Sequence, residues 1–134
     1  MRFLVMALAK GDRSAAPDGG PGAAAAAKML DYQKSLQKAG VLLAGDELFP
    51  PSTGARIACL DGRPTVTDEP FSQSKEAIRS YWVIQVRSRE EAIEWAKRAP
   101  MSNNKVIEVR QIHDLSDLHE DVRKAAEGFE HLTR

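Results

Sequence analysis

Carboxylates, a lysine and an aromatic ring gather in two stretches of the chain that could do chemistry. The first is "GDEL", where Asp46 and Glu47 follow the apolar run "VLLAG". The second is "VTDEPFSQSKE", which contains Asp68, Phe71 and Lys75. Paired carboxylates can hold different pKa values and exchange protons, and a nearby lysine can bind an anion. We expect the two stretches to lie close together and to border a site.

Each of these residues also has a structural interpretation. Asp68 lies in a turn, where aspartate commonly caps backbone N–H groups. Phe71 is more often a core residue than a ligand contact. Asp46 and Glu47 can equally be the solvated end of a strand, and Lys75 can belong to a charged helix start.

Two aromatic residues, Tyr81 and Trp82, lie side by side in the run "SYWVIQVR". This run is dense in β-branched and aromatic residues, which predicts a strand. Neighbouring side chains of a strand point to opposite faces. One of the two should therefore enter the core, and the other should line a pocket or an interface.

The histidines and the single cysteine supply little for nucleophilic or metal chemistry. His113, His119 and His131 all lie near the C-terminus, without i, i+4 spacing, and no His/Cys cluster exists. His119 and His131 are expected to face solvent. Cys59, in "RIACL", is interpreted as a buried and inert thiol. No catalytic residue, metal site or cofactor is assigned.

The bulk composition narrows the class of protein. The 134 residues suit one domain with a hydrophobic core, and 43% hydrophobic with 28% charged residues is typical of a globular chain. The formal net charge is zero, so no overall field favours nucleic acid or an anionic membrane. No secretion signal or membrane-spanning run is present, and we expect a cytoplasmic protein.

Hydrophobic periodicity predicts a mixed set of elements. An Asp61-Gly62 pair between two strand-like runs is typical of a tight β-hairpin. The helix "AAAAAKMLDYQKSLQKAG" carries an apolar stripe, and "REEAIEWAKRA" follows a capping box formed by Ser88 and Glu91. The remaining expected elements are strands at Arg2–Ala9, Val41–Gly45, Ser80–Arg87 and "KVIEVRQI", and a terminal amphipathic helix with Leu115, Leu118, Val122, Ala125, Phe129 and Leu132 on one face.

The order of elements predicts an α+β fold, a ferredoxin-like βαββαβ sandwich with an extra hairpin and a C-terminal helix. Residues 1–112 would form the domain, and residues 113–134 would form the amphipathic helix, packed on the domain or on a dimer partner. Strand Arg2–Ala9 is apolar almost throughout, which is typical of a strand covered on both faces. A sheet with helices on one face leaves the other open, so a homodimer is expected.

Three quoted stretches together resemble one known family. "GVLLAGDELFPP", "DGRPTVTDEPFSQSKEAIRSYWVIQVRSREEAIEWAKRAP" and "VIEVRQI" are similar in order and spacing to the YCII-related family, in its DGPF branch, whose signature is V-T-D-G-P-F-x-E-T-K-E. The resemblance implies a ferredoxin-like fold that pairs as a dimeric α/β barrel. Glu69 stands at the signature's glycine, Gln73 replaces its glutamate, and the early histidine of enzyme-like relatives is missing.

Two functions of different classes remain after these observations. The first is a homodimer that binds a small molecule near the "TDEPF" turn, with Asp46, Asp68, Phe71, Lys75 and Tyr81 as lining residues. The second is a non-enzymatic dimeric regulatory or protein-interaction module that uses the terminal amphipathic helix. The sequence assigns no reaction and no ligand identity, and it favours neither nucleic acid nor membrane as a partner.

Overall fold

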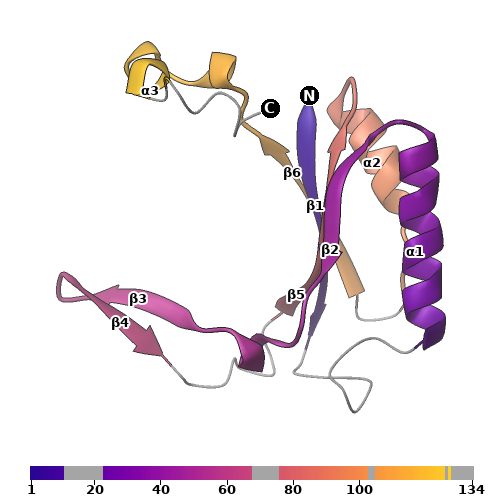
Figure 1. Ribbon diagram of the computed structural model, residues 1–134, viewed down its shortest axis with the longest axis horizontal. Coiled ribbons are helices and arrows are strands. Elements are labelled where there is room, and N and C mark those ends of the chain that lie inside the picture. Colours follow the sequence, from indigo (N-terminus) through magenta and orange to yellow (C-terminus); the bar gives the residue numbers. More distant parts are fainter. Residues whose placement is uncertain (11–22, 68–75, 103–104, 126, 128–134) are drawn as a thin grey trace.

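The computed structural model describes residues 1–10, 23–67, 76–102, 105–125 and 127 (Figure 1). The strands are β1 (Arg2–Lys10), β2 (Leu42–Glu47), β3 (Arg56–Leu60), β4 (Arg63–Thr67), β5 (Glu76–Gln85) and β6 (Lys105–Ile112). The helices are α1 (Ala23–Lys38), α2 (Arg89–Lys97) and α3 (Glu120–Ala125), with short 3-10 helices at Pro51–Thr53 and Leu115–Asp117.

A four-stranded antiparallel sheet in the order β2-β5-β1-β6 forms the centre of the molecule. Helices α1 and α2 both cover the same face of this sheet (Figure 1). The elements β1, α1, β2, β5, α2 and β6 therefore follow the βαββαβ order, and the predicted ferredoxin-like α+β fold is confirmed. The extra hairpin is also confirmed, because β3 and β4 form a separate two-stranded sheet inserted between β2 and β5.

The hydrophobic core lies between the sheet and the two helices. Alternate residues of β1 and β5 point into it, as the period of two in a strand requires. The prediction that the first strand is covered on both faces is wrong for the single chain, because both helices lie on one side and Leu4, Met6 and Leu8 are only half-buried on the other. The buried apolar side chains are Phe3, Val5, Ala7, Tyr32, Leu36, Trp82, Ile84, Val86, Ala92, Ala96 and Ala99.

Tyr32 joins α1 to both the sheet and α2. Its ring meets that of Trp82 edge to face, with centroids 5.5 Å apart, and its hydroxyl donates a hydrogen bond of 2.7 Å to the Trp95 carbonyl. Burial raises the pKa of Tyr32 to about 12, against the smaller opposing effects of Trp82 and Arg98. Within the described residues the buried Trp82 indole N–H has no hydrogen-bond partner.

Local sequence explains where the two covering helices begin and end. Ser88 caps α2 by accepting a 3.1 Å hydrogen bond from the Glu91 N–H. The expected capping box is modified, because the Glu91 carboxylate accepts from the Arg87 N–H at 2.9 Å instead of from Ser88. At the end of α1, Gly40 has φ +77°, which only glycine adopts without strain. The apolar stripe was expected to run from Met29 through Tyr32 and Leu36 to Ala39, but Ala39 is exposed.

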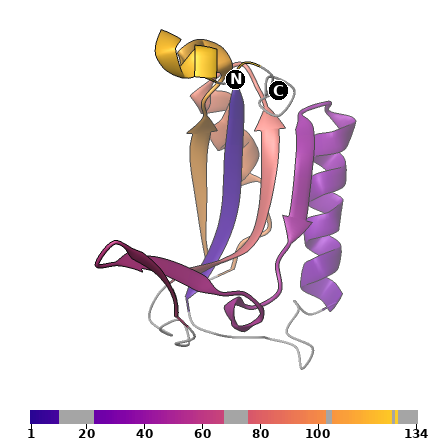
Figure 2. The ribbon, with the colours of Figure 1, turned by 60° about the vertical axis from the view of Figure 1, so that its left-hand side comes forward.

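The β3–β4 hairpin projects from one end of the sheet, on the side away from α1 and α2 (Figures 1 and 2). Asp61 and Gly62 at its tip have φ of 53° and 77°, as the predicted Asp-Gly turn requires. Cys59 is exposed on this hairpin, so its interpretation as a buried thiol is wrong for the single chain. The apolar run around it belongs to an arm and not to the core.

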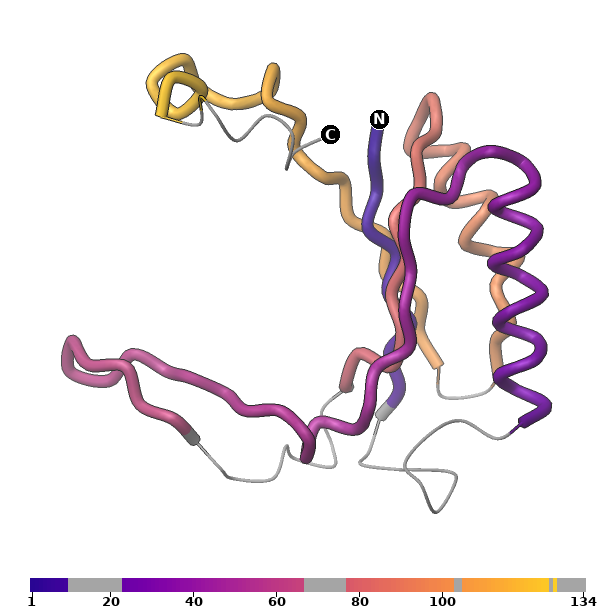
Figure 3. Tube along the Cα trace, in the orientation of Figure 1, coloured from indigo at the N-terminus to yellow at the C-terminus, as the bar shows by residue number. Residues whose placement is uncertain are grey.

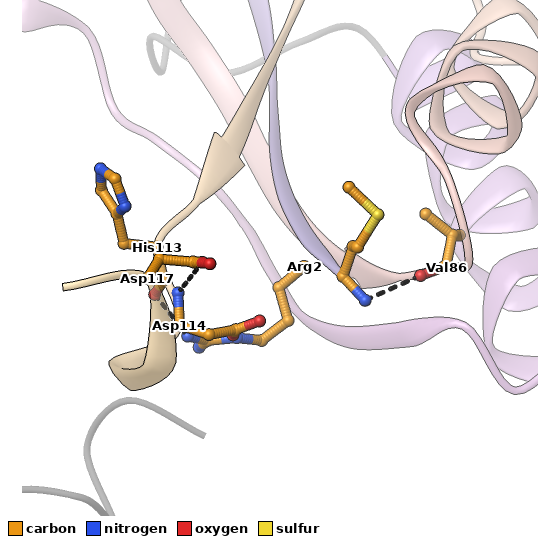
Figure 4. A network of polar contacts seen from close by, with 6 residues as sticks. Arg2, Val86, His113, Asp114 and Asp117 are labelled. Atoms are coloured by element: carbon orange, nitrogen blue, oxygen red, sulfur yellow. Dashed lines mark hydrogen bonds and ion pairs between the residues drawn. The ribbon is translucent and has the colours of Figure 1, made fainter.

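The chain after β6 leaves the opposite end of the sheet, again on the side away from the helices (Figure 3). The side chain of Arg2 fixes the start of this segment to β1. Its guanidinium contacts the Asp114 carboxylate at 3.3 Å and the His113 carbonyl at 3.1 Å (Figure 4). The expected continuous helix is interrupted, because Leu118 is extended between the 3-10 helix and α3. Phe129, His131 and Leu132 lie outside the described residues.

Candidate functional site

The uncovered face of the four-stranded sheet, which we term the open face, contains a row of side chains that crosses every strand. Asp46 of β2 pairs with Tyr81 of β5, Tyr81 pairs with Met6 of β1, and Met6 pairs with Glu108 of β6. These four residues form the cross-strand row. On one side of it the open face continues with Val83, Leu4 and Arg110, and on the other side with Leu8 and Val106.

Asp46 and Tyr81 form the polar centre of the cross-strand row. The Tyr81 hydroxyl donates a hydrogen bond of 3.1 Å to Oδ2 of Asp46. This hydrogen bond, together with the negative charge of Asp46, raises the pKa of Tyr81. At neutral pH the phenol therefore keeps its proton, so Tyr81 acts as a hydrogen-bond donor and not as a base.

Gly45 explains why β2 can bring Asp46 to this place. It pairs with Trp82, and a Cβ at Gly45 would lie 3.0 Å from the Trp82 Cβ and 3.3 Å from the amide of Gln33 on α1. Only a residue without a side chain allows β2 to pass this closely beneath the helix. The glycine of "AGDE" thus sets the position of the carboxylate that follows it.

The sequence left two interpretations of Asp46 and Glu47 open, a carboxylate pair or the solvated end of a strand, and the structure favours the second, because both residues are exposed at the end of β2. Strand β2 runs on to Glu47 instead of ending at Gly45, so consecutive residues 46 and 47 point to opposite faces. Partial burial raises the pKa of Glu47, and the charge of Lys105 opposes this effect. Glu47 therefore lies outside the cross-strand row.

Tyr81 and Trp82 are arranged as the strand pattern predicted. Trp82 is fully buried in the core, and Tyr81 lies on the open face beside Asp46. Sequence reasoning missed Met6, Glu108 and Arg110, the last two of which form an exposed ion pair of 3.4 Å. Their positions follow from strand register between β1, β5 and β6, which no local motif encodes.

Three of the five predicted site residues, Asp68, Phe71 and Lys75, lie outside the described residues. The structure brings the other two, Asp46 and Tyr81, into contact. The described strands end at Thr67 and resume at Glu76, which begins β5, the strand of Tyr81. The expected proximity of the "TDEPF" turn to Asp46 stays a prediction.

A hollow of about 740 Å³ lies elsewhere, at the end of the sheet where β5 leads into α2. Its polar groups serve the fold, since the Met1 ammonium donates to the Val86 carbonyl at 2.9 Å (Figure 4) and the Glu91 carboxylate accepts from the Arg87 N–H. The lining residues are Met1, Ala39, Val41, Gln85, Val86, Arg87 and Glu91. Neither Asp46 nor Tyr81 belongs to it, so the hollow is not part of the candidate site.

The described histidines do not enter the candidate site. His113 contributes its carbonyl to Arg2, and His119 is exposed beside Asp121, with 3.7 Å between Nδ1 and Oδ2. Within the residues that the structure describes, no group of three or more histidine, cysteine, aspartate or glutamate side chains could hold a metal ion. The open face thus presents hydrogen-bonding groups on an apolar sheet.

Comparison with protein families gives one result that covers most of the chain. Residues 1–116 match the model of the YCII-related domain. Comparison with curated proteins returned no match. Among the described helices, none is long and apolar enough to cross a membrane.

Proposed function

Because the chain belongs to the YCII-related family, we propose that it is a homodimer that binds a small molecule on the open face of its sheet. The contact between Asp46 and Tyr81 carries this proposal, since it places an acceptor and a donor together on an apolar surface. Ligand sites typically combine a mostly apolar lining with a few fixed polar groups. The open face has this composition.

The chemistry of the cross-strand row favours a particular kind of ligand. The Asp46 carboxylate can accept further hydrogen bonds, the Tyr81 oxygen can accept one while its proton is donated to Asp46, and the Met6 thioether offers a polarisable apolar contact between Tyr81 and Glu108. A flat or aliphatic molecule with an amine or hydroxyl group would match these functions. The proposed activity is binding, and no step of a reaction is assigned to these residues.

The signature stretch would complete the site from the neighbouring part of the chain. Asp68, Phe71 and Lys75 are proposed to form its rim, because they precede β5 and thus the strand that presents Tyr81. In this proposal Lys75 would pair with an anionic group of the ligand and Phe71 would cover its apolar part.

The homodimer is proposed because one face of the sheet lacks a covering layer. Val106 is 44% exposed and Ile78 is 41% exposed, while Leu4, Met6 and Leu8 are only half-buried. Large exposed apolar patches on a globular protein usually mark interaction sites. Residues 113–134 would pack against the partner, because their described part, up to α3, leaves the sheet on its open side (Figure 1).

A binding screen tests the proposed site. Small-molecule fragments are screened by the rise in melting temperature of the wild type, and each hit is repeated on Asp46→Asn and Tyr81→Phe. Both variants should lose most of the rise, whereas Asp31→Asn, on the exposed side of α1, should keep it. Hits that stabilise Asp46→Asn and the wild type equally would place the binding site elsewhere.

The C-terminal segment that contains α3 favours a second function, a non-enzymatic protein-interaction module. Val122 of α3 is 51% exposed, and no residue of α3 is buried. An apolar side chain on an uncovered helix is suited to contact another protein.

A further inference from the structure

The β3–β4 hairpin has one apolar face that its own chain does not cover. Ile57 pairs with Val66, and Cys59 pairs with Pro64. Because side chains alternate along a strand, these four residues share one face of the hairpin, and Thr65 lies on the other. Ile57 is 70% exposed and Val66 is 59% exposed.

This hairpin is built as an arm and not as part of the main sheet. In the described part of the chain, neither β3 nor β4 pairs with a third strand. An isolated two-stranded hairpin is only marginally stable in water, and three strands or a packed face are needed for stability. The Asp61-Gly62 turn fixes the register, so the apolar face is preformed. Such a face gains stability only when another surface covers it.

The open face of the sheet lies on the side toward which the hairpin projects. The hairpin leaves one end of the sheet and the segment containing α3 leaves the other, both away from α1 and α2 (Figures 1 and 3). An object seated on the open face would therefore lie between these two projections. A second copy of this chain, with its own open face turned toward the first, is suited to this place, and the ligand proposed at Asp46 and Tyr81 would then lie between the two sheets.

We propose that the occupant is a second copy of this chain and that each copy lays its hairpin on the other. The face made of Ile57, Cys59, Pro64 and Val66 is then buried between the two copies. This inference rests on the homodimer of the proposed function. It adds that the hairpin, and not the sheet alone, holds the dimer together.

The apolar surface that is exposed in one chain is of the size that a stable dimer needs. Burying a Val, Leu, Ile or Met side chain removes roughly 60–120 Å² of apolar area, from about 1.5–3 kcal/mol at about 25 cal/mol/Å². About ten half-exposed side chains of the hairpin and the open face would then bury roughly 500 Å² per copy. Since about 57% of an interface is apolar, this corresponds to roughly 900 Å² of apolar and polar surface per copy, against a standard of about 800 Å² per partner. Because the formal net charge is zero, two copies of the chain have no net electrostatic repulsion to overcome.

Two neighbouring residues of β4 provide a matched test. Val66→Glu puts a charge on the apolar face, and Thr65→Glu puts the same charge on the opposite face one residue away. Light scattering after gel filtration should show a dimer for the wild type and for Thr65→Glu. The dissociation constant of Val66→Glu should rise at least about 100-fold, because its charge would be buried unpaired.

The outcomes distinguish a failure of the proposed hairpin contact from a failure of the proposed function. A dimer of unchanged affinity in Val66→Glu overturns the role of the hairpin, while fragment binding at Asp46 is still judged by its own screen. A wild type that is monomeric at 100 µM overturns the hairpin exchange together with the homodimer.

Cys59 gives a second measurement that does not depend on the folding of a variant. It is the single cysteine of the chain and lies on the apolar face of the hairpin. In the dimer its thiol should react with an aromatic disulfide reagent at least about 10-fold more slowly than in the denatured chain, and dilution to monomer should restore the rate. Full reactivity in the dimer, or equal protection in the monomer, contradicts the proposal.

Discussion

Replacing Gly45 by alanine should destabilise the fold, because this position lies against the core and sets the place of Asp46. The new Cβ would lie 3.0 Å from the Trp82 Cβ and 3.3 Å from the Tyr81 carbonyl oxygen. Trp82 is fully buried and the carbonyl belongs to the paired strand β5, so neither can move aside freely. The Gln33 amide, also 3.3 Å away, belongs to a longer side chain that can rotate.

The expected cost follows from two opposing effects. Inserting a methyl group into a packed region typically costs about 1–3 kcal/mol. Replacing glycine also restricts the unfolded chain, which offsets about 0.4–1 kcal/mol. The net loss in the free energy of unfolding should be about 1–2 kcal/mol. For 134 residues this lowers the melting temperature by about 4–7 °C.

Gly54→Ala is the matched control for this substitution. Gly54 is exposed, has φ −111°, and its Cβ would meet only the Pro51 carbonyl oxygen at 3.7 Å. Its alanine variant should melt at or slightly above the wild-type temperature when all three proteins are compared at one concentration by circular dichroism. Equal melting temperatures for the two alanine variants would refute the close approach of β2 to Trp82.

Three further predictions concern the tyrosines and the C-terminal segment. The chain has two tyrosines, so in the variant Tyr32→Phe the ultraviolet absorbance of phenolate reports Tyr81 alone. Adding Asp46→Asn to this variant should lower the pKa of Tyr81. An unchanged pKa would mean that the hydrogen bond between Tyr81 and Asp46 is not formed. Burial raises the pKa of Tyr32 to about 12, so the folded state binds more protons than the unfolded state between pH 10 and 12. The stabilisation due to the buried neutral phenol is complete below pH 10, and roughly 2–3 kcal/mol of it is lost as the pH rises to 12. Urea unfolding should show this loss in the wild type and not in Tyr32→Phe. The same dependence of the free energy of unfolding on pH in both proteins would contradict the prediction. Deleting residues 114–134 removes the ion pair between Asp114 and Arg2. If this C-terminal segment serves self-association, gel filtration of the deletion variant should show a weakened dimer. An unchanged dimer of unchanged stability would favour an outside protein partner.

The parts of the fold that depend on local physics could be predicted from the sequence. The Asp61-Gly62 turn specifies a hairpin because both positions need positive φ, and the structure has φ of 53° and 77° there. Tyr81 and Trp82 had to face opposite sides of their strand, and Trp82 is the buried one. The order of the elements then limited the topology to a ferredoxin-like sheet.

The parts that depend on register and on strand ends could not be predicted. The cross-strand row joins residues far apart in sequence, such as Met6 and Glu108, and only the pairing of the four strands brings its members together. Asp46 and Glu47 looked like a carboxylate pair because the strand was expected to end at Gly45. Two more residues of strand place them on opposite faces.

The exposure of the Cys59 thiol could not be predicted from the sequence either. An apolar run such as "RIACL" is typical of the core, and the sequence does not state which surface will cover it. In this chain the run forms a hairpin arm, and its apolar face is left open by its own sheet. Burial by a second copy, as proposed, would reconcile the apolar sequence with the exposed structure.

The central claim, a ligand site on the cross-strand row, is tested most directly by NMR of the methionine methyl groups. The chain has four methionines; Met6 lies in the row beside Tyr81, whereas Met29 packs from α1 against the core and Met101 is exposed after α2. Fragments that raise the melting temperature should shift the Met6 signal, leave those of Met29 and Met101 in place, and lose this effect in Asp46→Asn. Binding that shifts Met29 or Met101 while Met6 stays unchanged would contradict the account.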